Sequence, residues 1–369
     1  MESALGAYGN ASSVHAAGRA ARARVEQARD QIGRLAGASP SFVVFTGGGS
    51  EGNALALRGA VAGAAQAESR ITRLLISAVE HDSVRANAAA LAETVPGLKL
   101  SEIPVSKHGQ LDLDALRLAL MHGKGRVLVS IMAANNETGV LQNIPEVGRL
   151  VKAEGGNGAL FHVDAIQTAG RMRESFASSF VDYMTLSAHK LGGPQGVGAL
   201  IVRDGAPLSP LIAGGGQESG RRSGTENVAA ISGFGAAAQE VAEVVDSWGV
   251  IRALRDRFEA DLKHLAPEAV IFGEGAERLP NTSNFAIPEL AAETALIALD
   301  LDGVAVSSGS ACSSGTVKPS HVLAAMGVPA NLARCGLRVS FGWSSREGDV
   351  DAVIASLRRL IARRAALAA

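Results

Sequence analysis

The sequence predicts an α/β protein in which a large domain with a mostly parallel sheet precedes a smaller α+β domain. Short apolar runs alternate with helical patterns between residues 42 and 202, and strands separated by helices form parallel sheets with right-handed crossovers. The 43 glycines gather at the predicted strand ends, which favours an α/β protein over a helical bundle. After residue 244 the pattern changes, so we predict domains at residues 1–244 and 245–369.

The first domain begins with a predicted amphipathic surface helix over residues 19–34. Apolar residues from Ala17 to Leu35 recur at helical spacing, with acidic residues between them. Residues 144–154 predict another helix, because Pro145 lies near its start and Gly155 follows its end. The predicted strands lie at residues 42–45, 74–77, 99–103, 127–132, 160–163, 182–187 and 199–202.

The second domain begins with a long predicted helix over residues 251–265, which carries Ile251, Leu254 and Phe258 on one face. Short strands mixed irregularly with helices then indicate an α+β arrangement. These elements are strands at residues 270–272, 284–287, 304–307 and 337–341, a helix at residues 291–299 and a last helix near the end of the chain.

Composition and charge exclude several classes of protein. Hydrophobic residues make up 47% of the chain and aromatic residues 4%, so we expect a core of Ala, Val, Leu and Ile. A formal net charge of -1 gives no general attraction to nucleic acid or anionic membranes. No apolar run reaches the roughly eighteen residues of a membrane span. Two cysteines without a secretory signal predict a protein of the reducing cytoplasm.

Lys190 is the most informative residue of the chain. The apolar run at residues 182–187 ends in Ser187, and His189, Lys190 and several glycines follow. A lysine held at a rigid strand end, beside a hydroxyl and an imidazole, suits a Schiff base to pyridoxal phosphate. The alternative is an ordinary surface lysine in a loop.

A glycine-rich segment follows the first predicted strand and opens a helix. Helix N-termini bind phosphate through free backbone N–H groups, and glycine lets the anion come close. Gly47, Gly49 and Gly52 also match the dinucleotide fingerprint, and Glu80 could serve as its ribose-binding acid. A nicotinamide-dependent oxidoreductase is therefore a competing interpretation, and a tight turn without a ligand is another.

Polar residues at other strand ends suit the same ligand. Asp164 ends a predicted strand, where a buried carboxylate could hold a pyridine nitrogen protonated; helix capping is the alternative. His81 could stack on a ring or move protons, or be only a surface residue. Asn135 follows the strand at residues 127–132, and turn formation is its alternative role.

Cys312 lies in a small, polar segment rich in serine and glycine, unlike the apolar setting of most buried cysteines. A free thiol with a pKa near 8.5 is only about 3% thiolate at pH 7. A pKa lowered by about 1.5 units makes about half of it nucleophilic. Such a thiol could receive a group from a bound substrate, whereas Cys335 is expected to have a packing role.

Together these residues resemble the cysteine desulfurases, which are pyridoxal-phosphate enzymes of the class V aminotransferase group. The resemblance runs almost from end to end and implies a fold-type-I transferase with a large cofactor-binding domain. Its motifs are residues 9–15, 46–53, 80–81, 135–139, 162–167, 187–190, 222–225, 307–313 and 337–340.

The resemblance implies a role for each cofactor-binding residue. Lys190 would carry the cofactor, Asp164 would pair with the ring nitrogen, and Gln167 would contact the ring hydroxyl. His81 would stack on the ring. The groups that hold the phosphate would be Gly49, Ser50, Ser187 and His189, joined by Thr225 from a second subunit.

The resemblance also implies the reaction. Asn135 and Arg338 would bind the carboxylate of L-cysteine, for which a guanidinium offers a two-pronged match. Cys312 would attack the substrate sulfur and leave as a persulfide, with L-alanine as the other product. The partners would be a second copy of the chain and a sulfur acceptor such as an iron–sulfur scaffold. No metal site is expected, although a cluster could transiently involve Cys312.

The chain departs from the family pattern in two places. The usual Asp-x-x-Ala-Thr-Thr segment is absent, and Met1 is expected to match an internal position of the family. Gly49 and Ser50 replace the common Ala-Thr pair, and Gln217 stands where histidine is frequent. Serine keeps the hydroxyl, so we expect phosphate binding to survive. A selenocysteine lyase, a nicotinamide-dependent oxidoreductase and a non-catalytic partner-binding protein are the alternatives.

Overall fold

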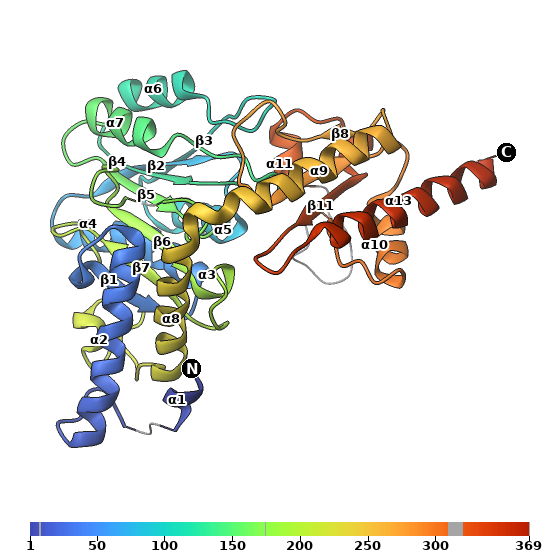
Figure 1. Cartoon of the computed structure of the whole chain (residues 1–369). Coiled ribbons are helices and arrows are strands. Elements are labelled where there is room, and N and C mark those ends of the chain that lie inside the picture. Colours follow the sequence, from blue (N-terminus) through green and yellow to red (C-terminus); the bar gives the residue numbers. More distant parts are fainter. Residues whose placement is uncertain (7–8, 174, 309–319, 369) are drawn as a thin grey trace. The chain divides into compact units, whose positions relative to one another are not determined.

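The computed structural model of the protein describes residues 1–6, 9–173, 175–308 and 320–368. This part of the chain forms two compact units (Figure 1). The first consists of Met1–Pro104, Asp112–Ala133 and Gln142–Val245, and the second of Val105–Leu111, Ala134–Leu141 and Asp246–Ala369. In the sequence, Val105–Leu111 and Ala134–Leu141 lie between strands of the first unit. They nevertheless pack with the second unit.

The described residues of the first unit form a 7-stranded sheet in the order β1-β7-β6-β5-β4-β2-β3. Neighbours from β3 to β6 are parallel, whereas β7 is antiparallel to both β6 and β1. The mostly parallel α/β fold is thus confirmed, and each predicted strand of this part of the chain has an observed counterpart. The strands are β1 (Val43–Thr46), β2 (Ile71–Ser77), β3 (Lys99–Ile103), β4 (Arg126–Met132), β5 (Leu160–Asp164), β6 (Tyr183–Ser187) and β7 (Gly198–Val202).

The short connection between β6 and β7 explains why β7 runs antiparallel. Residues 188–197 contain only the helical turn η3 (Ala188–Lys190). A parallel crossover needs about a dozen residues or more, usually with a helix, so this segment can only return the chain alongside β6. Lys190 is consequently held in a tight turn between two buried strands.

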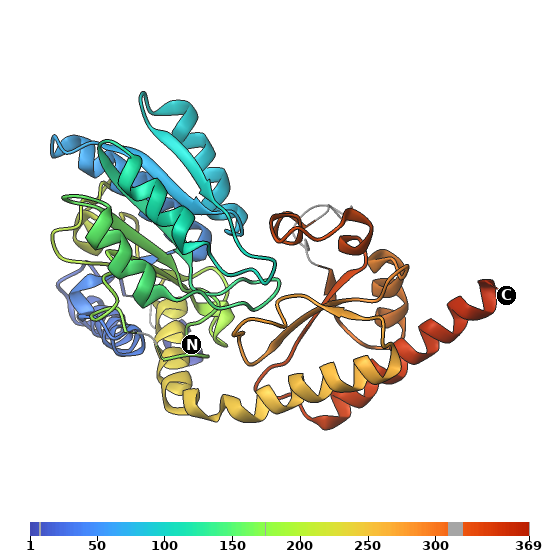
Figure 2. The ribbon, with the colours of Figure 1, turned by 90° about the horizontal axis from the view of Figure 1, so that it is seen from above.

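Helices cover both faces of the first sheet (Figures 1 and 2). Leu74, Leu128 and Leu160 share a buried cluster with residues of η2, α4 and α5. The other face meets α7, where Gly148 lies beside the ring of Phe161. The helices are α1 (Glu2–Leu5), α2 (Ala16–Ala36), α3 (Gly49–Ala54), α4 (Ala60–Gln66), α5 (Asp82–Thr94), α6 (Leu113–His122), α7 (Ile144–Glu154) and α8 (Val228–Val244), with short turns η1 (Pro40–Phe42), η2 (Leu55–Gly59) and η4 (Gln217–Gly220).

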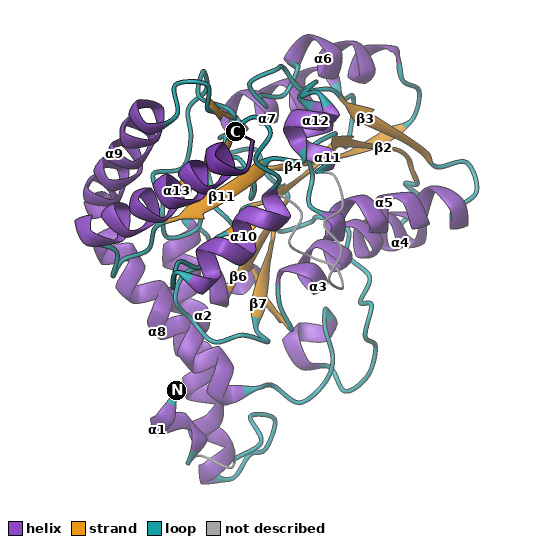
Figure 3. Cartoon of the chain, turned by 90° about the vertical axis from the view of Figure 1, so that its right-hand side faces the viewer, coloured by secondary structure: helices purple, strands orange, loops and turns teal. Residues whose placement is uncertain are grey.

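The second unit has a small antiparallel sheet in the order β10-β11-β9-β8. The helices α9, α10 and α13 lie beside its strand β11 (Figure 3). Its elements are η5 (Val245–Trp248), α9 (Gly249–Leu265), β8 (Val270–Ile271), β9 (Thr282–Ala286), α10 (Ala292–Leu301), β10 (Ser307–Ser308), α11 (His321–Ala325), α12 (Ala330–Ala333), β11 (Gly336–Ser340) and α13 (Glu347–Ala368).

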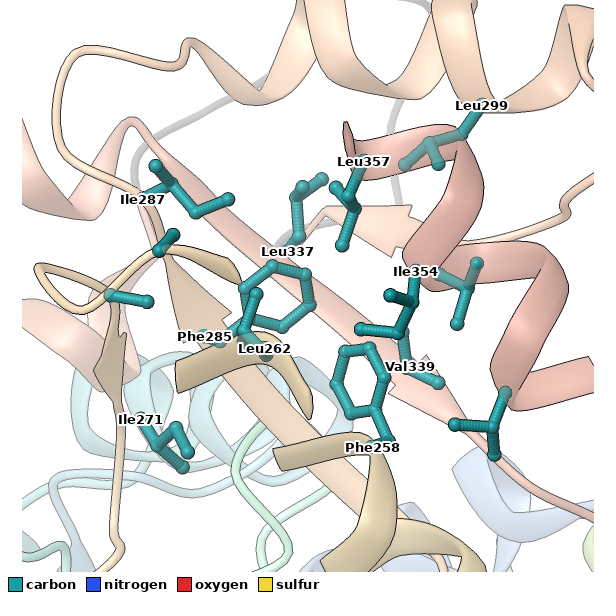
Figure 4. Close-up of a cluster of buried hydrophobic side chains, with 14 of the residues drawn as sticks. Phe258, Leu262, Ile271, Phe285, Ile287, Leu299, Leu337, Val339, Ile354 and Leu357 are labelled. Carbon is teal, nitrogen blue, oxygen red and sulfur yellow. The ribbon is translucent and has the colours of Figure 1, made fainter. Parts of the chain in front are cut away.

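The core of the second unit forms where these helices meet the sheet (Figure 4). Phe258 of α9 meets Phe285 of β9 edge to face, with ring centroids 5.4 Å apart. Leu337 and Leu357 complete the contact from β11 and α13. The helix periodicity predicted for residues 251–265 is therefore confirmed, because its apolar face is the one that packs here.

The strand predicted at residues 304–307 is largely wrong. The structure has only the two-residue strand β10, and residues 304–306 are irregular. Val304 and Val306 are partly buried against the core of the second unit. Their alternation therefore reflects packing of two valines and not pairing of a strand.

One stretch of the described chain, Val228–Leu265, is long and apolar enough to cross a membrane by length and composition alone. It comprises α8, η5 and α9, in which Phe234 and Phe258 are fully buried. Core helices of water-soluble proteins pass the same test, so the stretch is weak evidence for a membrane span. The prediction that the chain does not enter a membrane stays a prediction.

A buried histidine joins three strands beneath the strand ends. His162 of β5 is fully buried, and its Nδ1 lies 2.8 Å from Ser130 Oγ of β4. Its Nε2 lies 3.0 Å from Thr185 Oγ1 of β6. Burial lowers the pKa of His162 to about 3, so the imidazole is neutral in the folded protein at neutral pH.

We predict that His162 makes folding weaker in mild acid. Below about pH 6.5 the His162 imidazole binds a proton in the unfolded chain but stays neutral in the folded chain. The free energy of unfolding therefore falls as the pH falls. Urea unfolding of the apoprotein at pH 7.5, 6.5 and 5.5 measures this dependence. Between pH 6.5 and pH 5.5 the free energy of unfolding should fall by about 1 kcal/mol more in the parent than in His162→Gln. Equal losses in both proteins would contradict the assignment.

Candidate functional site

Asp164 lies at the carboxyl end of β5 and is almost fully buried. Its Oδ1 accepts a hydrogen bond from the backbone N–H of Ile166 at 3.0 Å, and its Oδ2 accepts one from Asn53 Nδ2 at 2.7 Å. Burial raises the pKa of Asp164, while both hydrogen bonds and the nearby His81 oppose that rise. No helix begins here among the described residues, so the capping alternative does not apply.

Asn53 connects Asp164 to the start of α5, and sequence reasoning did not single it out. Its Nδ2 also donates to Ser83 Oγ at 2.9 Å, and that hydroxyl lies 2.8 Å from His81 Nδ1. His81 caps α5, because its Nδ1 accepts the backbone N–H of Ser83 at 3.1 Å. A proton on the neutral ring therefore sits on Nε2. The available signal was a polar residue in an otherwise Ala- and Leu-rich helical stretch.

Lys190 and Asp164 leave the same edge of the sheet. Strands β5 and β6 are parallel neighbours, with Asp164 opposite Thr185, and η3 follows β6 directly. Within that turn Ser187 Oγ lies 3.0 Å from His189 Nδ1. Desolvation and the neighbouring charge of Lys190 lower the pKa of His189, so the imidazole tends to be neutral. The carboxyl ends of parallel strands are where α/β sheets bind ligands.

Arg171 ties the segment after β5 to the segment after β6. Its Nη1 donates to the backbone carbonyl of Gln167, and its Nη2 donates to the carbonyl of Lys190 at 2.9 Å. Burial lowers the pKa of Arg171 to about 10, which still leaves it charged at neutral pH. The predicted ring-contact residue Gln167 and the predicted anchor Lys190 are therefore held by one guanidinium.

The glycine-rich turn places the start of α3 against the same edge. Gly48 has a φ of 146°, which side chains rarely allow. A Cβ on Gly49 would lie 2.2 Å from the Ile166 side chain and 3.4 Å from Ser187 Cβ. Gly49 is thus brought next to Ser187, while Ser50 is exposed in the first helical turn. The first N–H groups of a helix lack intrahelical acceptors, so they can bind a phosphate.

The nicotinamide interpretation does not survive the strand order. A dinucleotide fingerprint lies in a βαβ unit whose two strands are parallel neighbours. Here β1 is an edge strand, and β7, β6, β5 and β4 separate it from β2. Glu80, the candidate ribose-binding acid, is fully buried, and its Oε1 accepts the backbone N–H of Met132 at 2.7 Å. Burial raises its pKa well above the ordinary value, which is the opposite of an exposed ribose ligand.

Thr225 is exposed and lines a hollow of about 200 Å³ with Gly47. Its loop is held by Arg222, which pairs with both carboxylate oxygens of Glu51 at 2.8 and 3.3 Å. Gln217 Oε1 accepts the backbone N–H of Gly224 in the same loop at 3.0 Å. The predicted contact of Thr225 with a phosphate in a second subunit stays a prediction.

The second unit carries the two predicted substrate-binding residues. Asn135 Oδ1 accepts the backbone N–H groups of Glu137 and Thr138 at 2.9 and 3.0 Å, so its oxygen is used for the turn. Any contact with a carboxylate therefore falls to its Nδ2, which is a donor as such a contact requires. Arg338 Nη1 donates to the carbonyl of Asn136 at 2.8 Å, which joins β11 to the Asn135 turn.

The structure describes one of the two cysteines. Cys312 lies outside the described residues. Cys335 is buried in the second unit, and its Sγ lies 3.5 Å from the carbonyl oxygen of Asn331. Groups of three or more His, Cys, Asp or Glu side chains that could hold a metal ion do not occur in the described part of the chain.

Comparisons with known proteins place this arrangement in a family. A family model described as aminotransferase class-V matches residues 2–353. A curated cysteine desulfurase from Nostoc sp. strain PCC 7120 is 41% identical over 361 residues, which is 98% of this chain and 88% of that protein. The chain belongs to the class-V aminotransferases, among the cysteine desulfurases.

Solved structures extend the similarity to the fold of this desulfurase family member. A NifS-like protein from Rickettsia africae ESF-5 has a TM-score of 0.87 and 34% identity, covering 98% of this chain and 94% of that one. A second structure, titled SspA in complex with cysteine, has a TM-score of 0.77 and 29% identity, covering 91% of each chain. The predicted fold and family are both confirmed.

Class-V aminotransferases use pyridoxal phosphate, and the described residues fit this cofactor. A buried carboxylate at a strand end suits a protonated ring nitrogen, and a helix start opened by glycines suits a phosphate. Asp164 supplies the carboxylate, Gly49 lies at the helix start, and Lys190 supplies a lysine. All three lie at one edge of the same sheet. The cofactor prediction is therefore confirmed at the level of the family.

Proposed function

We propose that this desulfurase family member removes sulfur from L-cysteine, releases L-alanine and holds the sulfur as a persulfide on Cys312. The placement of Asp164 and Lys190 carries the proposal, because they leave adjacent parallel strands at the same sheet edge. Lys190 would anchor the cofactor by a covalent bond and Asp164 would pair with its ring nitrogen, so both residues must lie at the same edge of the sheet.

Each predicted cofactor-binding residue of the first unit then has a defined role. Asp164 would hold a proton on the ring nitrogen, Gln167 would contact the ring hydroxyl, and His81 would stack on the ring and move protons from Nε2. The chemistry supplied by a bound cofactor would be that of an electron sink for the substrate, which would favour breaking of the substrate's C–S bond. The phosphate-binding groups are Gly49, Ser50, Ser187 and His189.

The remaining residues handle substrate and sulfur. Arg338 and the Nδ2 group of Asn135 bind the substrate carboxylate, and the Cys312 thiolate attacks the substrate sulfur. The new S–S bond replaces the C–S bond, whose electron pair stays with the substrate carbon. A proton completes L-alanine, so cysteine and one thiol yield alanine and one persulfide without an added oxidant.

We further propose a homodimer in which Thr225 reaches the phosphate bound by the other copy, and a sulfur-acceptor protein such as an iron–sulfur scaffold. The exposure of Thr225 on a tethered loop supports the first part. A persulfide must be passed on before the next turnover, which supports the second. A reducing cytoplasm, where we expect the protein, keeps such thiols reduced between turnovers.

The test is to incubate the purified protein, loaded with pyridoxal phosphate, with L-cysteine and a thiol reductant. We expect alanine and sulfide to appear in equal amounts. A protein that binds the cofactor but releases neither product would refute the proposed function. Selenocysteine in parallel assays separates the main alternative, because a selenocysteine lyase would turn over the selenium substrate and leave cysteine almost untouched.

A further inference from the structure

Asn53 is a fully buried side chain whose amide reaches two parts of the candidate site. It lies in α3, and its Nδ2 donates to Asp164 Oδ2 at 2.7 Å and to Ser83 Oγ at 2.9 Å. Ser83 Oγ in turn lies 2.8 Å from His81 Nδ1. One amide group therefore joins the proposed partner of the ring nitrogen to the residue proposed to stack on that ring.

The two hydrogen bonds have different chemical consequences. Asp164 is useful to a protonated ring nitrogen only as a carboxylate, and burial favours its neutral form. An N–H donor to the carboxylate favours the charged form. The neighbouring Glu80 is a second buried carboxyl group, and the two carboxyl groups disfavour each other's charged form, whereas His81 favours the charged form of Asp164. Among side chains, Asn53 gives Asp164 a direct donor that does not itself titrate.

The other side of the Asn53 amide shows which end of the side chain makes the contacts. Its Oδ1 is buried and has no hydrogen-bond partner among the described residues. An unpaired buried carbonyl destabilises the fold, so the favourable contacts of this side chain are those of its donor end. The side chain is thus oriented by its donor end, toward Asp164 and Ser83.

We propose that Asn53 is a positioning residue that holds the Asp164 carboxylate and, through Ser83, the His81 ring in the arrangement that the cofactor ring requires. This inference rests on the proposed function. It predicts that Asn53 controls how tightly the cofactor is bound and how its spectrum responds to pH, and not only how stable the protein is.

The test compares Asn53→Leu with Asn87→Leu. Leucine has nearly the shape of asparagine but no donor, and Asn87 of α5 donates to the Ser83 carbonyl at 2.7 Å without contacting Asp164. Asn53→Leu should raise the dissociation constant of pyridoxal phosphate at least about tenfold, as expected for loss of a hydrogen bond to a charged group. The pH midpoint of the bound cofactor's visible band should move by about half a unit or more. Asn87→Leu should change the dissociation constant by less than about twofold and the pH midpoint by less than about 0.2 units.

Urea unfolding of each apoprotein measures stability apart from cofactor binding, because the apoprotein contains no cofactor. Unchanged cofactor affinity and an unchanged pH midpoint in Asn53→Leu would overturn the inference. If Asn53→Leu does not fold, Asn53→Asp decides, since it keeps the shape and replaces the donor with a second carboxylate. We expect it to bind the cofactor more weakly still, and parent-like binding would overturn the inference. If the parent itself binds no cofactor, the proposed function fails instead.

Discussion

Replacement of Cys312 by alanine should lower sulfide release from L-cysteine by at least about a hundredfold, while the cofactor remains bound. In the proposed reaction the thiolate forms the new S–S bond, and alanine offers no atom that can accept sulfur. The measurement pairs the initial rate of sulfide release with the visible absorbance of the bound cofactor. Retained absorbance shows that the lost rate reflects the thiol and not a lost cofactor.

Cys335→Ala is the matched control for this prediction. Cys335 is buried and its thiol contacts the backbone of the same helical segment, so it lacks access to a substrate. Its replacement should leave sulfide release within about twofold, even if removing a buried thiol lowers stability by about 1 kcal/mol. Parent-like sulfide release from Cys312→Ala would contradict the assignment of the nucleophile.

Replacement of Lys190 by alanine should abolish the visible band of the lysine-bound cofactor and lower turnover by at least about a thousandfold. In the proposed function the ε-amino group of Lys190 forms the covalent bond to the cofactor, and the turn between β6 and β7 offers no second lysine. An absorbance spectrum of the dialysed protein after loading tests the bond directly. The turnover rate with saturating free cofactor measures the activity that remains without the covalent bond.

Lys124→Ala serves as the control for Lys190→Ala. Lys124 is exposed and lies in the connection between α6 and β4. Its replacement removes the same positive charge from the protein but should leave both band and turnover unchanged. A Lys190→Ala protein with the parent spectrum would overturn Lys190 as the anchor, and with it the role assigned to the β6–η3 segment.

Most of the first sheet could be predicted because buried parallel strands appear as short apolar runs between helices. The helix over Ile144–Glu154 matches its prediction, since proline and glycine mark its two ends. The orientation of β7 and the short β10 were not predicted. Both depend on pairing partners far away in the chain, and local periodicity carries no information about them.

The candidate site could be predicted in part for the same reason. Asp164 and Lys190 end two strands, and parallel neighbours share an edge, so their proximity follows from the strand pattern. Asn53 could not be found this way, because it lies inside a helix. It reaches Asp164 only because Gly52 lets α3 approach β6, where a Cβ would lie 2.7 Å from Thr185 Cγ2.

The sequence by itself determined which chemical groups this protein has and in what order they leave its strands. A lysine in a tight turn, a carboxylate at a strand end and a glycine-opened helix together indicate one cofactor, and their order indicates the family. The tertiary structure alone decided which groups touch. It showed that one ring nitrogen of His81 caps α5 and that Asn53 donates a hydrogen bond to the Asp164 carboxylate. Hydrogen bonds of this kind depend on distances below about 3.5 Å, which only the packing of helix on sheet can set.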